Sequence, residues 1–190
     1  MTALARRLGA ELVVSHTIFL VSERSPRAAR YLEALRLGRE AGEGIPVAIE
    51  SNQFNKRKRL YLLDDLARLG RFAQAHGYGV TFDTCHAGAN REDLLEDYAI
   101  VRPVLKNVHL SDVVWRGEQP HTHLVPGEGA LPLRSFLGAL AADGYDGLVT
   151  MEIHPWYVSQ LSTAQAERKL RQAVEFERAA IATPATSGRE

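Results

Sequence analysis

Val80-Thr-Phe-Asp-Thr-Cys-His86 is a short apolar run that ends on the carboxylate of Asp83, with an imidazole three residues later. Its apolar residues alternate as in a β-strand, and Gly88 and Asn90 predict a turn after it. Taken alone, this pattern is more typical of a capped strand end followed by a loop histidine than of a site. The interpretation changes because the same arrangement recurs along the chain.

Five runs of strand-forming residues are each followed at once by a side chain that can bind a metal or carry a proton. The predicted strands are Glu11–Ser15, Ile45–Ile49, Gly79–Phe82, Leu105–Val108 and Leu148–Met151, and the groups that follow them are His16, Glu50, Asp83, His109 and Glu152.

Segments with apolar residues at helical spacing lie between these runs. The predicted helices span residues 2–8, 26–41, 60–76, 92–101, 132–143 and 162–182. Alternation of strands and helices predicts an α/β fold with a parallel sheet, in which ligands bind beyond the carboxyl ends of the strands. Five polar groups at five strand ends are therefore expected to converge on one place.

The composition fits one globular domain, which we expect to span residues 1–182, with a disordered polar tail at 183–190. Of the 190 residues, 45% are hydrophobic and 24% charged, and 23 basic residues balance 23 acidic ones. Zero net charge gives no general attraction to nucleic acid or membranes, so neither is expected as a partner. The single Cys85, together with the lack of a signal peptide or membrane span in the sequence, favours the reducing cytoplasm.

Two connections in the sequence have a functional interpretation. Residues 51–59 include the basic run Lys56-Arg-Lys-Arg59, which either binds a phosphate group or forms an ordinary solvated charge run. Residues 113–130 form the longest predicted loop, and they include Arg116, His121 and His123. Loops of this length in a compact domain are usually functional or disordered.

Glu50, Asp83, His109 and Glu152 form a set of three carboxylates and one imidazole. Such a set suits Mn²⁺, Mg²⁺ or Co²⁺, with Zn²⁺ as a further candidate. Without a cation, clustered carboxylates would repel and raise one another's pKa values. We therefore predict one divalent metal ion.

A metal on the vicinal oxygens of a substrate would stabilise an enediolate, while carboxylates on either side of it move a proton. Glu50 and Glu152 are the candidates for that acid/base pair, because they are the first and last ligands in the series. His86 and Arg116 are candidates for holding substrate hydroxyls or the developing oxyanion.

Five motifs together resemble the xylose isomerase-like TIM-barrel superfamily, which contains sugar isomerases and epimerases and the zinc-dependent apurinic-site endonucleases. They are Ala48-Ile-Glu-Ser-Asn52, Phe82-Asp-Thr-Cys-His86, Val108-His-Leu-Ser-Asp112, His123-Leu-Val-Pro-Gly-Glu-Gly129 and Gly144-Tyr-Asp-Gly-Leu-Val-Thr-Met-Glu152. Each motif is weak alone, but their order and spacing are specific.

The resemblance implies a (β/α)₈ barrel in which the predicted strands correspond to strands four to eight. A complete barrel takes about 250 residues, so we expect an incomplete barrel of five βα units, arising from a mis-assigned start or a fragment. An open sheet of this kind would have two unprotected edges.

For function, the resemblance implies a metal-dependent isomerase or epimerase of a sugar or sugar phosphate. Glu50, Asp83, His109 and Glu152 would be the metal ligands, and the two glutamates would also be catalytic. His86 would contact substrate, and Arg116 lies one residue from its expected position. His16 and His123 are further candidates for substrate binding, and homo-oligomerisation is left open.

Two alternatives remain. A zinc-dependent apurinic-site endonuclease would use His16, His86 and His123 as additional ligands, but His121 stands where that branch has an acidic residue. A truncated, non-catalytic remnant would keep the ligands without a complete barrel.

Overall fold

The computed structural model describes residues 2–17, 25–42, 44–52, 63 and 65–182. Its centre is a five-stranded parallel sheet with the strand order β1-β2-β3-β4-β7. The strands are β1 (Val13–His16), β2 (Val47–Glu50), β3 (Gly79–Asp83), β4 (Leu105–Leu110) and β7 (Leu148–Met151). The predicted α/β fold with an incomplete barrel is therefore confirmed, although most strands end one or two residues later than predicted.

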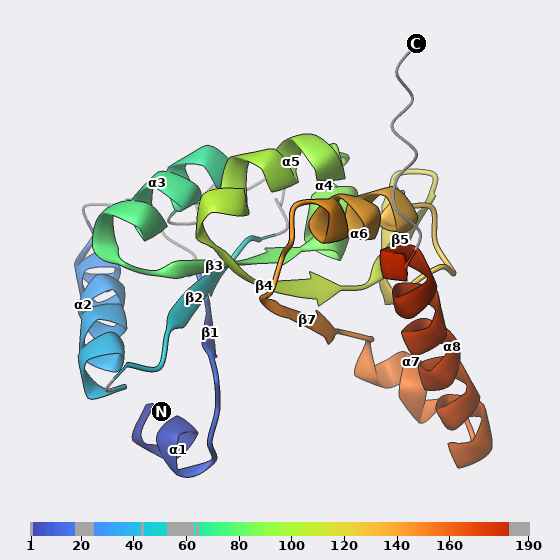
Figure 1. Ribbon diagram of the computed structural model, residues 1–190, viewed down its shortest axis with the longest axis horizontal. Helices are drawn as coiled ribbons and strands as arrows, with labels where there is room; N and C mark the ends of the chain where they lie inside the picture. The colour runs from blue at the N-terminus through green and yellow to red at the C-terminus, as the bar shows by residue number, and fades with distance from the viewer. Residues whose placement is uncertain (1, 18–24, 43, 53–62, 64, 183–190) are drawn as a thin grey trace.

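Helices follow the strands in the expected alternation, and α3, α5 and α6 lie along one face of the curved sheet (Figure 1). The helices are α1 (Thr2–Arg7), α2 (Pro26–Ala41), α3 (Leu66–His76), α4 (Thr84–Asn90), α5 (Leu94–Val101), α6 (Leu133–Ala142), α7 (Pro155–Ser159) and α8 (Thr163–Ala182), with a 3₁₀ turn at Arg102–Val104. Within the described part of the chain, none of them combines the length and apolarity that crossing a bilayer requires.

The core lies between the sheet and these helices. All five residues of β3 are buried, as expected for a strand covered on both faces. Phe82 of β3 packs against Phe136 of α6, with ring centroids 5.6 Å apart, and Tyr98 of α5 packs edge-on against Phe136. These aromatic contacts fix the helices behind β3, and thereby fix where its carboxyl end lies.

The predicted helix over residues 60–76 is wrong in its first part. Leu63 has a left-handed backbone, with φ of 61°, so a continuous helix cannot pass through it. Helix α3 instead begins at Leu66, where the Asp65 side chain accepts a hydrogen bond from the Arg68 amide. The described residues do not include positions 60–62 and 64, the basic run at 56–59 or the tail at 183–190.

Two segments expected as loop or turn are regular structure. The long loop contains an antiparallel hairpin of β5 (Asp112–Arg116) and β6 (Gln119–Leu124). Gly117 supplies the positive φ of 63° that its two-residue connection needs. The expected turn at Gly88 lies inside α4, where a Cβ on Gly88 would come 2.4 Å from Leu131 Cδ2. Gly88 therefore permits close packing and does not form a turn.

Candidate metal centre

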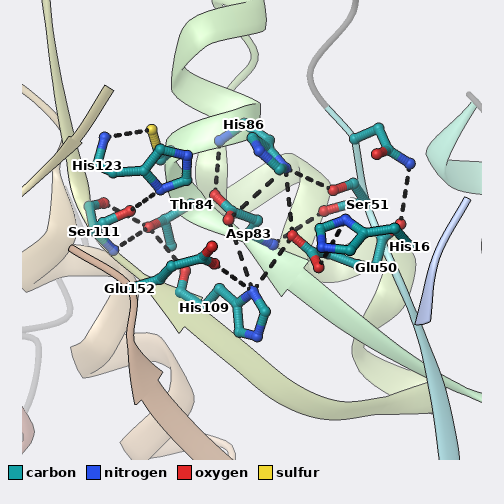
Figure 2. Close-up of polar contacts among 12 residues, drawn as sticks. His16, Glu50, Ser51, Asp83, Thr84, His86, His109, Ser111, His123 and Glu152 are labelled. Carbon is teal, nitrogen blue, oxygen red and sulfur yellow. Dashed lines mark hydrogen bonds and ion pairs between the residues drawn. The ribbon is translucent and has the colours of Figure 1, made fainter. Parts of the chain in front are cut away.

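Four of the predicted ligands converge at the carboxyl end of the sheet (Figure 2). Glu50 ends β2 and Asp83 ends β3. His109 lies opposite Asp83 in the β3–β4 register, and Glu152 directly follows β7. Each side chain offers one donor atom, and the four atoms lie within 4.8 Å of one another. Strand order therefore brings together residues that are up to 102 positions apart in the sequence, from 50 to 152.

His109 is at the centre of this cluster. Its Nδ1 lies 2.7 Å from Glu152 Oε2, 3.3 Å from Glu50 Oε1 and 3.9 Å from Asp83 Oδ2. One nitrogen thus faces an oxygen of each of three carboxylates. This is the donor set of a hard divalent cation with a single imidazole ligand.

Because the carboxylates of the cluster are buried, their negative charges are unfavourable unless a positive charge lies nearby. The Glu50 side chain is fully buried, and Asp83 is buried as well. Both oxygens of Glu50 and Oδ2 of Asp83 accept no hydrogen bond among the described residues. Buried carboxylate oxygens are normally paired or bound to a metal. A divalent cation therefore fits the residues present.

The pKa values follow the same electrostatics. Burial raises the pKa of Asp83, and nearby His86 only partly offsets this. The contact with His109 lowers the pKa of Glu152 to about 2. Burial opposes the protonation of His109, but Glu152 and Glu50 together raise its pKa to about 10. Without a metal, the His109 imidazolium supplies the positive charge that the carboxylates require.

His86 and His16 flank Glu50 on the solvent side. His86 Nδ1 lies 2.8 Å from the Ser51 carbonyl oxygen, which can only accept, so Nδ1 carries a hydrogen and donates it. The same atom lies 3.7 Å from both Glu50 Oε1 and Asp83 Oδ2. His16 ends β1, and its Nδ1 lies 3.2 Å from Glu50 Oε2.

His123 is a further imidazole near the cluster, in contact with His86. Its ring meets that of His86 edge-on, with centroids 5.5 Å apart, and its Nδ1 lies 3.4 Å from Ser111 Oγ. The His123 amide donates to Cys85 Sγ, and the residue has a positive φ of 54°. A non-glycine residue in this conformation is uncommon, and strained residues of this kind cluster at active sites and ligand-binding sites.

Arg116 lies apart from these histidines. It ends β5 opposite Gln119, beside the Gly117 turn, and its side chain is exposed. Its predicted role in substrate binding stays a prediction.

Hydroxyl residues next to the ligands hold the strand ends in place, and the sequence interpretation missed them. Ser51 Oγ accepts a hydrogen bond from the Asp83 amide, 3.0 Å away. Thr84 Oγ1 donates to the Ser111 carbonyl and accepts from the Ser111 amide, at 2.7 Å and 3.1 Å. The signal that could have identified them is their position, because Ser51 and Thr84 each directly follow a ligand.

Asp112, also missed, organises the loop after the hairpin. Its Oδ1 accepts from the Leu131 amide and its Oδ2 from the Gly127 amide, both at 3.0 Å. A Cβ on Gly129 would lie 2.3 Å from Asp112 Oδ1, so this position requires glycine. Close packing against a buried carboxylate thus explains Gly129, whereas Gly127 has a positive φ of 89° and lies against Phe176.

Comparison with known proteins identifies relatives of this fold. The sequence model described as xylose isomerase-like TIM barrel matches residues 1–180. A comparison with curated proteins gave no match.

Several solved structures resemble the chain. A xylose isomerase domain protein from Alicyclobacillus acidocaldarius is 26% identical with a TM-score of 0.69, covering 95% of this chain and 67% of its own. A D-psicose 3-epimerase from Clostridium cellulolyticum H10, solved with D-tagatose, is 19% identical with a TM-score of 0.71, with coverage of 95% and 68%. The IolI protein, solved with a zinc atom, is 18% identical with a TM-score of 0.70, with coverage of 96% and 66%. The chain spans between 61% and 68% of the length of these and similar solved structures.

Proposed function

Because the chain belongs to the xylose isomerase-like TIM barrel family, we propose that it acts as a divalent-metal-dependent isomerase or epimerase of a sugar or sugar phosphate. The relatives include an epimerase solved with a ketose and a protein solved with zinc, which supports this class. The observation that carries the proposal is the convergence of Glu50, Asp83, His109 and Glu152 within 4.8 Å.

These four residues would hold the cation through three carboxylates and one imidazole. A bound divalent cation polarises a substrate carbonyl and stabilises negative charge on adjacent oxygens. The buried Glu50 oxygens and Asp83 Oδ2 support this assignment, because they accept no hydrogen bond among the described residues and a cation would supply the missing partner. Mn²⁺, Mg²⁺ and Co²⁺ suit the oxygen-rich set best, and Zn²⁺ is a further candidate.

Glu50 and Glu152 are the proposed acid/base pair. Glu50, at the end of β2, and Glu152, after β7, approach His109 from opposite sides of β4, so a substrate between them would present a different face to each. The contact with His109 lowers the pKa of Glu152 to about 2, so this carboxylate is ionised at neutral pH. One glutamate would remove the proton, and the other would return it to the opposite face or to the neighbouring carbon.

The imidazoles of His86, His16 and His123 would bind substrate hydroxyls. His86 Nε2 accepts a hydrogen bond when its Nδ1 donates to Ser51, which suits a hydroxyl donor. His16 contacts Glu50 and is largely exposed, with 65% of its side chain accessible, so it lies where a substrate would enter.

The direct test is turnover of a panel of ketoses and ketose phosphates by the metal-stripped protein reloaded with Mn²⁺, Mg²⁺, Co²⁺ or Zn²⁺. We expect interconversion only with metal present, and at least a tenfold rise over the stripped protein. The Glu167→Gln variant is a control and should respond to metal as the unmodified protein does. Among the contacts described, Glu167 pairs only with Arg171, on the surface of α8. Metal binding without turnover of any sugar would support the non-catalytic remnant instead.

The surplus of imidazoles favours one alternative, a zinc-dependent apurinic-site endonuclease. His16 and His86 lie within 3.2 Å and 3.7 Å of Glu50, which is more nitrogen than one oxygen-rich site needs. The zero net charge gives no general attraction to DNA. Cleavage of abasic DNA, with no sugar turnover in the same preparation, would replace the isomerase proposal.

A further inference from the structure

A small polar cavity lies beside the candidate metal centre, between Ser51 and Asn52 on one side and helices α3, α4 and α5 on the other. Its volume is about 20 Å³, which is room for one ion or one water. Its apolar wall includes Leu66, Leu69 and Phe82. Its polar wall includes Ser51, Asn52, Asn90, Glu92 and Asp97. None of these polar side chains belongs to the four-residue cluster.

Asp97 is the unusual residue of this cavity. It lies on the buried side of α5 and is only 9% exposed, yet among the described residues no N–H or O–H group donates a hydrogen bond to its Oδ2, and the side chain interacts with the carboxyl group of Glu92. A buried carboxylate oxygen that lacks a hydrogen-bond donor destabilises the folded protein. Other carboxylates of α5, such as Asp93 and Glu96, are exposed and need no such explanation. An oxygen of this kind, lining a cavity of this size, points to a missing ligand.

The neighbour of Asp97 is another carboxyl group. Burial raises the pKa of Asp97 to about 7, and contact with Glu92 adds to the effect. Burial likewise raises the pKa of Glu92. Asn90 Nδ2 donates to Glu92 Oε2 and to the Asn52 carbonyl oxygen, both at 3.2 Å. Two carboxylates in contact are stable only with a shared proton or with a cation between them.

We propose that Glu92 and Asp97 form a second cation site, which takes a hard divalent ion such as Ca²⁺ or Mg²⁺. Carboxylate and amide oxygens are the ligands that such ions prefer, and Asn52 and Asn90 line the same cavity. The ion would satisfy Asp97 Oδ2 and remove the repulsion between the two carboxyl groups. Water from the solvent-exposed side of Glu92 would supply the remaining ligands, because two carboxylates do not fill the coordination shell of either ion.

The position of the cavity gives this ion a structural role. Asn52 Nδ2 donates to the Glu50 carbonyl oxygen at 3.3 Å and also to Thr17 Oγ1. An ion that fixes Asn52 and Asn90 would therefore hold the end of β2, which carries Glu50. This is a different task from that of the four-residue cluster, and it does not depend on the proposed reaction.

The test counts bound ions in the full chain without substrate. After equilibrium dialysis against Ca²⁺ or Mg²⁺, elemental analysis should give two ions for the unmodified protein and one for Asp97→Asn. The double variant Glu50→Gln/Glu152→Gln should also bind one ion, and the combination of all three substitutions should bind none. Glu96→Gln, an exposed glutamate one residue before Asp97, is the matched control and should bind two.

Glu92→Gln repeats the test from the less buried side of the cavity, in case Asp97→Asn disturbs the core. Circular dichroism checks that each variant retains its helices. We expect either substitution to weaken Ca²⁺ binding at this site at least tenfold. The proposal is overturned if the double variant at the four-residue cluster binds no ion, or if Asp97→Asn and Glu92→Gln both bind as many ions as the unmodified protein. In either case the carboxyl pair holds only a proton.

Discussion

Glu152 differs from the other three ligands because 40% of its side chain is exposed, whereas Glu50 is fully buried. We predict that Glu152→Gln lowers kcat for sugar interconversion by at least a hundredfold, the scale of a general acid/base contribution. The amide oxygen can still coordinate, so the variant should retain part of its metal. Parallel measurements of turnover and metal content check this, and unchanged turnover would remove Glu152 from the chemistry.

His109 should make metal binding depend on pH. Its pKa is raised to about 10 in the metal-free protein, so the imidazole is protonated at pH 7, and a metal must displace that proton. Apparent affinity should therefore rise with pH, by about tenfold per unit between pH 7 and 9 for one proton released. Glu152, with a pKa of about 2, is ionised throughout and adds nothing to this slope.

Titration calorimetry at several pH values measures the effect. An ordinary histidine, with a pKa near 6.5, would give an affinity that levels off above pH 7. Such a plateau would show that His109 is not held as an imidazolium by Glu152 and Glu50.

The convergence of Glu50, Asp83, His109 and Glu152 could be predicted because each lies at or next to the carboxyl end of a recognisable strand. Their environment could not be predicted in the same way. That His86 donates to the Ser51 carbonyl, or that Glu50 is fully buried, depends on how neighbouring strands are placed in space. No spacing in the sequence carries that information.

At the scale of elements, the strands and the long helices were predictable from apolar runs and helical spacing. The hairpin β5–β6 was missed because its second strand, Gln119–Leu124, is mostly polar and contains Pro120. Its Gly117-Glu118 turn was nevertheless a usable signal. Helix α4 was missed because its small residues show no amphipathic period, and because Gly88 resembled a turn residue.

Helix α5 gives a prediction about capping. The Asp93 side chain accepts hydrogen bonds from the amides of Leu95 and Glu96, at 2.8 Å and 3.1 Å. Asp93→Ala should lower the free energy of unfolding by about 1 kcal/mol. This corresponds to a Tm lower by about 2–4 °C in a chain of this length.

Urea and thermal unfolding measure the loss. The control is Glu96→Ala on the exposed face of the same helix, which we expect to change stability by less than about 0.5 kcal/mol. If both variants unfold alike, the Asp93 cap does not stabilise α5.

At the scale of the whole molecule, the parallel sheet is open. Among the described residues, β1 pairs only with β2, and β7 pairs only with β4. An unpaired edge offers backbone donors and acceptors to another chain. We therefore predict association that increases with protein concentration.

Leu148→Lys should weaken that association, because Leu148 is 38% exposed on the edge strand β7 and a charge there opposes strand pairing. Sedimentation velocity over a range of concentrations measures it. Leu37→Lys on α2 is the matched control, since Leu37 is 50% exposed but lies on a helix. An equal effect of both substitutions would point to general surface hydrophobicity, not to the sheet edge.

The unequal burial of the two glutamates has an isotopic consequence. A hydrogen taken up by Glu50 is shielded from bulk water, whereas one on the partly exposed Glu152 exchanges readily. Suppose that Glu152 abstracts the hydrogen in one direction of the reaction and Glu50 abstracts it in the other. Deuterium from the reacting carbon should then exchange with water faster in the direction in which Glu152 abstracts it. The solvent label carried by each product would then identify which glutamate acted on which face.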